Sequence, residues 1–169
     1  MKYLNQYTIP FSGLKVGNHK FDFEVDEKFF ACFEESEISN GKLHVTALLE
    51  KQSIMMILEL KIEGTVNVSC DRCSEPFNLE FSANDKFYIK FSDEPIDDDE
   101  IIVLEHNEHE LKLGQKIFEL IILNLPFRRV HEEGKCNPEV LKNLEKYQTK
   151  EEDKKDDPRW ELLKKIKFN

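Results

Sequence analysis

The stretch ILELKIEGTVNVSCDRCSEPFNLEF, residues 57–81, decides how this chain folds. From Leu58 to Cys70 the even positions are apolar apart from a glycine, and the odd positions are polar. Successive side chains of a strand point to opposite faces, so this alternation predicts a strand with one buried and one solvated face, and Cys70 is in phase with the buried one. The alternation resumes at Phe77 and extends to Phe91. We therefore predict a long antiparallel hairpin with Cys70 and Cys73 at or near its tip.

The remaining segments indicate an α+β fold. Strand-like composition marks 20–25, 42–50 and 101–104, whereas residues 26–41 fit either a short helix or a strand and end in an Asn-Gly pair that predicts a turn. Apolar residues at helical spacing predict a buried helix over 109–126, which Pro126 stops, and Asn137-Pro138 is typical of a helix start for 137–147. The predicted fold is one antiparallel sheet of about six to seven strands, curled or barrel-like, with two or three helices in the carboxyl half.

Composition divides the 169 residues into a body and an appendage. We predict a single domain over 1–147, a polar linker over 148–157 and an amphipathic C-terminal segment over 158–169, which carries Trp160. Because no run of 18 apolar residues occurs and the first residues lack a signal-type apolar core, we expect neither a membrane partner nor secretion. The expected location is the cytoplasm, where cysteines serve as thiols or metal ligands more often than as disulfides.

The net charge of −10 argues against broad wrapping of nucleic acid, because phosphate binding depends on Lys and Arg. It leaves room for a local basic patch, or for a basic protein held by the acidic loop at 92–100. The chain has no glycine-rich phosphate loop, no nucleophile elbow and no His-Glu-x-x-His. We therefore expect no catalysis and no small-molecule substrate.

The four residues Cys70, Cys73, His131 and Cys136 are candidate zinc ligands. Two cysteines separated by two residues match the spacing of one half of a zinc site, and His131 and Cys136 could complete a tetrahedral set. This hypothesis requires the hairpin tip to meet the 131–136 segment. A dithiol redox protein is the alternative, although redox Cys-x-x-Cys pairs are typical of helix N-termini and this pair lies between strands.

Three separated segments resemble the YceD family of large ribosomal RNA subunit accumulation proteins. They are SCDRCSEPF at 69–77, LNLPFRRVH at 123–131 and DPRWELLKKI at 157–166, and the resemblance covers roughly residues 55–169. Many members carry a second cysteine cluster after the Leu-Pro, whereas this chain has only Cys136 there with His131 nearby. In this respect HEEGKCNPEVLKNL at 131–144 resembles the variant of the Bacteroidetes-like branch.

The resemblance implies a non-enzymatic, cytoplasmic factor that supports accumulation of large-subunit (23S) ribosomal RNA, with ribosomal RNA or ribosome-assembly proteins as partners. It brings no catalytic residues, so a binding surface has to be predicted from this chain. The candidate cationic residues for RNA or partner binding are Arg72, Arg128, Arg129, Arg159, Lys164 and Lys165. For the Arg128–Arg129 pair, a plain helix-end position complementing the helix dipole is an equal alternative. For Trp160 we expect docking onto the domain's own core.

Overall fold

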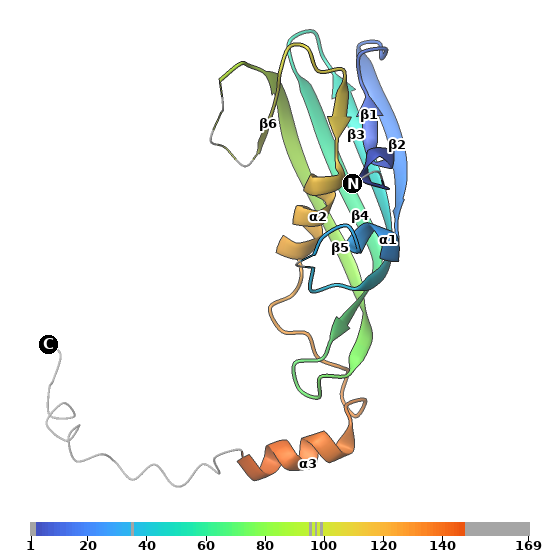
Figure 1. Cartoon of the computed structure of the whole chain (residues 1–169), viewed down its shortest axis with the longest axis vertical. Helices are drawn as coiled ribbons and strands as arrows, with labels where there is room; N and C mark the ends of the chain where they lie inside the picture. The colour runs from blue at the N-terminus through green and yellow to red at the C-terminus, as the bar shows by residue number, and fades with distance from the viewer. Residues whose placement is uncertain (1–2, 35, 95, 97, 99, 148–169) are drawn as a thin grey trace, which may run out of the picture.

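The computed structural model describes residues 3–34, 36–94, 96, 98 and 100–147, and its elements are shown in Figure 1. Their order is η1 (Tyr3–Gln6), β1 (Thr8–Pro10), β2 (Gly17–Val25), α1 (Glu27–Phe30), β3 (Asn40–Lys51), β4 (Met56–Ser69), β5 (Pro76–Phe91), β6 (Ile101–Leu104), β7 (Glu110–Lys112), α2 (Gly114–Leu123) and α3 (Pro138–Tyr147). The predicted linker at 148–157 and C-terminal segment at 158–169, with Arg159, Trp160, Lys164 and Lys165, lie outside the described residues.

Five strands form one sheet in the order β2-β3-β4-β5-β6. The first three neighbouring pairs are antiparallel, whereas β6 runs parallel to β5 with Tyr88 opposite Ile101. A separate antiparallel pair joins β1 to β7, with Ile9 opposite Leu111. The α+β class is confirmed, but the expected curled or barrel-like sheet of six to seven strands is wrong.

The sheet is open rather than closed because other elements cover its apolar face. Side chains from the β1–β7 pair and from α2, among them Ile9, Leu111 and Ile117, are fully buried in the same core as the sheet. With that face already covered, the sheet stays open and its outer strands do not pair with each other. A barrel would instead need its two edge strands to join.

The central strands show the predicted alternation. In β4, Leu58, Leu60 and Ile62 are buried, and β3 buries Leu43, Val45, Ala47 and Leu49 in the same way. The opposite face carries polar residues and exposed ion pairs such as Lys86–Glu59. Burial of one face and solvation of the other explains why the register of this hairpin is firmly set, because a slip of one residue would invert every side chain.

Two glycines allow close contact between β3 and β4. Gly64 has φ of +147°, and a side chain there would collide with the backbone carbonyl of Lys42. Gly41 lies inside β3, where an added Cβ would be 3.0 Å from the ring of Phe30. The turn predicted at Asn40-Gly41 is therefore wrong: packing against Phe30, rather than a reversal of the chain, requires the glycine.

The short helix α1 resolves the ambiguity of residues 26–41, because Asp26 accepts hydrogen bonds from the backbone N–H groups of Lys28 and Phe29 at its start. Helix α2 packs its buried residues Ile117, Leu120 and Ile121 against the core. Among the described residues, no helix has both the length and the apolar character needed to cross a membrane.

Candidate metal centre

The hairpin tip, residues 70–75, connects β4 to β5 and holds the Cys-x-x-Cys. The N–H of Cys70 donates to the carbonyl of Glu75 at 2.9 Å, and the N–H of Ser74 donates to the carbonyl of Cys70 at 2.8 Å. Ser74 adopts a left-handed φ of +59°, which closes the turn. Cys70 and Cys73 are both buried, at 2% and 5% exposure. The position of the motif at the tip is thus confirmed.

The 129–136 segment lies directly against this tip. The backbone N–H of Asp71 donates to the carbonyl of Arg129 at 2.7 Å, and the N–H of Arg129 donates back to the Asp71 carboxylate at 2.6 Å. Next to this pair, Nη2 of Arg72 donates to the carbonyl of His131 at 2.7 Å. Asp71 and Arg72, the two residues between the cysteines, therefore hold the segment that carries His131 and Cys136 against the hairpin tip. These hydrogen bonds form a clasp between the tip and the 129–136 segment.

The four candidate ligands converge. The ligand atoms of Cys70, Cys73, His131 and Cys136 all lie within 4.8 Å of one another. The Sγ atoms of Cys70 and Cys136 are 3.8 Å apart, and Nδ1 of His131 lies 3.4 Å from Sγ of Cys73 and 3.8 Å from Sγ of Cys136. The structure therefore shows the contact between the hairpin tip and the 131–136 segment that the zinc hypothesis requires.

These distances fit a tetrahedral zinc ion. With Zn–S bonds of about 2.3 Å and a Zn–N bond of about 2.0–2.1 Å, tetrahedral geometry sets sulfur atoms about 3.8 Å apart and sulfur and nitrogen about 3.6 Å apart. The 3.8 Å between Cys70 and Cys136 and the 3.4 Å between Cys73 and His131 are close to these values. Three thiolates and one imidazole form a donor set that favours zinc over magnesium or calcium. The residues present therefore fit the metal.

The thiols differ in how readily they lose a proton. Burial raises the pKa of Cys70, but backbone N–H groups of His131, Arg72 and Cys73 point toward its sulfur and bring the pKa down to about 5. Burial and the neighbouring sulfurs of Cys70 and Cys73 raise the pKa of Cys136. The lowered pKa of Cys70 favours its thiolate, the form that accepts a cation, whereas the raised pKa of Cys136 keeps its proton until a cation binds.

Apolar and hydrogen-bonding contacts surround the cluster. The rings of Phe77 and His131 lie 4.7 Å apart between centroids, and Val140 and Leu141 of α3 pack against the three cysteines. Asn137 joins α3 to the tip, since its Nδ2 donates to Glu75 at 2.8 Å while its Oδ1 caps the N–H of Glu139 at 2.9 Å. The helix start predicted at Asn137-Pro138 is confirmed, and α3 extends from the tip end of the molecule (Figure 1).

The candidate cationic residues do not all present free charge. Arg72 donates a hydrogen bond to the carbonyl of His131, and Nη1 of Arg129 pairs with the carboxylate of Glu37 at 2.7 Å. Both side chains are half-buried, and their contacts stabilise the fold. Arg128 is exposed, and within the described part of the chain its side chain makes no hydrogen bond or ion pair.

Sequence reasoning missed the roles of Asp71 and Phe127, and it predicted Asn137 only as a helix start, without its hydrogen bond to Glu75. Asp71 sits inside the motif, but its partner, the N–H of Arg129, is 58 residues away along the chain. Phe127 lies in LPFRR, between the proline that follows α2 and two arginines. Its exposure became evident only from the structure, where the side chain is 104% exposed.

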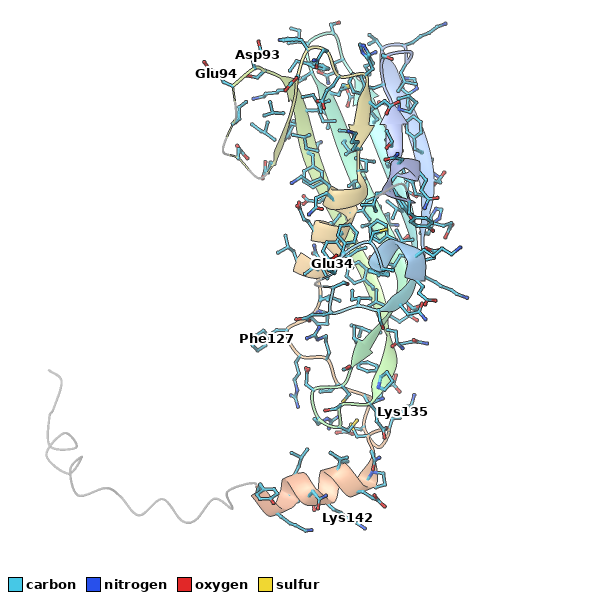
Figure 2. All side chains as sticks on the ribbon, in the orientation of Figure 1. Glu34, Asp93, Glu94, Phe127, Lys135 and Lys142 are labelled. Carbon is cyan, nitrogen blue, oxygen red and sulfur yellow. The ribbon has the colours of Figure 1, made fainter. Side chains whose placement is uncertain are left out.

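Acidic residues are concentrated in one stretch of the chain, which follows β5. Residues 92–110 contain nine acidic and no basic residues, so the other 150 residues carry 25 acidic against 24 basic ones. The segment begins where β5 ends at Phe91, whereas the tip precedes Pro76, and β5 spans roughly 50 Å at about 3.3 Å per residue. Figure 2 shows Asp93 and Glu94 at one end and Lys135 near the other. Since salt screens charges beyond about 10 Å, the acidic end exerts little force at the tip.

The family model described as large ribosomal RNA subunit accumulation protein YceD matches residues 58–167, which include most of β4, all of β5, the four candidate ligands and the chain beyond α3. Searches of curated proteins and of solved structures find no match.

Proposed function

Because the chain belongs to the YceD family of large ribosomal RNA subunit accumulation proteins, as its three motif segments predicted, we propose that it supports accumulation of large-subunit ribosomal RNA by binding the precursor RNA in the cytoplasm, without catalysis. The observation that carries this proposal is the clasp between the hairpin tip and the 129–136 segment, which places the exposed Arg128 next to the residue that contacts the tip.

The metal has a structural role in this proposal. Zinc bound by Cys70, Cys73, His131 and Cys136 joins the tip to the segment, within the small apolar cluster that is separate from the main core. Three thiolates, one neutral imidazole and Zn²⁺ leave a net charge of −1. Arg72, whose positive charge lowers the pKa of Cys136, compensates that charge from within the motif.

Metal content measured by mass spectrometry on protein purified without added metal tests the structural role. We expect about one zinc per chain in the wild type and in Cys32→Ala. Cys32 lies far from the cluster in the chain, and its thiol donates a hydrogen bond to the backbone carbonyl of Lys28. Cys136→Ala should lose the zinc and unfold at a lower temperature. A metal-free wild type with a reversible Cys70–Cys73 disulfide would contradict the zinc role and favour the dithiol redox alternative.

A second function has support from the acidic segment at 92–110. Its nine acidic residues could hold a basic ribosomal protein before assembly. The two functions separate by mutation and salt. RNA binding should fall steeply with salt and be lost when the exposed Arg128 is reversed to Glu, whereas binding of a basic protein should depend on Asp93, Glu94 and their neighbours.

A further inference from the structure

The side chain of Phe127 projects away from the body of the protein, as Figure 2 shows. It is 104% exposed, whereas the other eleven phenylalanines in the described part of the chain are buried or half-buried. Leu123, four residues earlier, is 82% exposed. Burying a phenylalanine in a core stabilises a fold by about 1.5–3 kcal/mol. A ring left wholly in solvent, in a chain that buries the others, is therefore available to a partner.

The backbone on both sides of Phe127 is held in place by hydrogen bonds. Before it, Nδ2 of Asn124 donates to the carbonyl of Leu120 at 2.9 Å and ends α2. After it, Arg129 exchanges two hydrogen bonds with Asp71, at 2.7 and 2.6 Å. An aromatic side chain has only two side-chain torsions, and here its backbone is already held. Little conformational entropy is therefore lost when the ring binds a partner.

The charge beside the ring indicates the kind of partner. Arg128 is exposed and free of ion pairs within the described residues, while the next residue, Arg129, is engaged by Glu37. Asp93 and Glu94 lie at one end of the molecule, well away from Phe127 (Figure 2). An exposed ring adjoining an unpaired guanidinium matches an unpaired nucleotide, whose base offers a flat face for stacking and whose phosphate accepts from arginine. In a duplex those faces are covered by neighbouring bases.

We propose that Phe127 and Arg128 form a binding point for single-stranded RNA, where the ring stacks on an unpaired base and the guanidinium contacts the adjoining phosphate. This inference rests on the proposed RNA-binding function and narrows it to unpaired segments of the precursor.

Fluorescence anisotropy with the full chain tests the inference. The probes are a labelled single-stranded RNA of about 12 nucleotides and a duplex of the same sequence. Phe127→Ala should weaken single-strand binding about 5- to 150-fold, the range that corresponds to ~1–3 kcal/mol per stacked base. Phe127→Tyr keeps a ring and should bind like the wild type. Arg128→Gln should lower the slope of log affinity against log salt by about 0.7.

Ile54→Ala is the matched control, because Ile54 is 89% exposed in the β3–β4 turn, away from the cluster, and should leave RNA binding unchanged. The inference is overturned if Phe127→Ala binds the single strand as tightly as the wild type, or if the duplex binds equally well. It is also overturned if Phe127→Ala keeps RNA binding and loses only the binding of a basic ribosomal protein, because the ring would then contact a protein partner. A wild type that binds neither RNA refutes the proposed function itself.

Discussion

Replacing Asp71 with alanine should weaken zinc binding although none of the four candidate ligands changes. The Asp71 carboxylate accepts from the N–H of Arg129 at 2.6 Å, and its own N–H donates to the carbonyl of Arg129 at 2.7 Å. The substitution removes the first bond and keeps the second. Hydrogen bonds to charged groups contribute about 1.5–3 kcal/mol, and the exposure of Asp71 reduces this to about 1–2 kcal/mol.

This loss acts on docking of the 129–136 segment, which must be in place before His131 and Cys136 can coordinate. We therefore expect zinc affinity to fall about 5- to 30-fold, which overlaps the roughly 10- to 100-fold loss typical of residues that orient metal ligands. The assay is competition with a chromophoric chelator at constant pH. Asp71→Asn keeps a neutral acceptor in place and should lose about half as much free energy as Asp71→Ala.

Glu37→Ala provides a sharper comparison, because it removes the other contact of Arg129. That contact is a surface ion pair with Glu37 67% exposed, so its loss should change zinc affinity less than about threefold. The absorption spectrum of the Co²⁺-substituted protein should show the same thiolate bands in all variants, since the ligands are intact. Equal zinc affinity in Asp71→Ala and the wild type would refute the clasp as the device that assembles the site.

Two further predictions concern stability. Gly64→Ala should cost about 2–5 kcal/mol by urea denaturation, because the added methyl meets the Lys42 carbonyl at a left-handed φ of +147°, whereas Gly13→Ala, with no atom within 4 Å, should stay within about 0.5 kcal/mol. Equal urea midpoints for the two variants would contradict this packing argument. His44 lies 2.8 Å from Glu24 and 3.2 Å from Asp22, and the hydrogen bond to Glu24 above all raises its pKa from 6.5. The protonated ring thus adds stability that is full below pH 6.5 and is lost as pH rises through the raised pKa. Wild-type protein should lose more stability than His44→Gln between pH 6 and 8; parallel pH profiles would show that the ion pair contributes nothing.

Much of the candidate site could be predicted because its parts are local. The alternation around Cys70 predicted both the strand and the burial of the thiol, and proline at 138 after a capping asparagine predicted where α3 begins. Such patterns reflect the fixed directions of neighbouring side chains along one strand or helix. His131 and Cys136 were predicted as ligands from residue type and spacing, but their approach to the tip had to be assumed.

What the sequence by itself determined is the hairpin, the place of the Cys-x-x-Cys on it, the α+β class and the family. Only the tertiary structure decided the parallel pairing of β6 with β5, the separate β1–β7 sheet, the engagement of Arg72 and Arg129 within the fold, and the exposure of Phe127. The reason is that the β1–β7 pairing and the contacts of Arg72 and Arg129 join residues far apart in the chain, while the direction of β6 and the exposure of Phe127 depend on the elements around them. Their energies depend on which surfaces meet once the chain has folded, and periodicity within one segment carries no record of that choice.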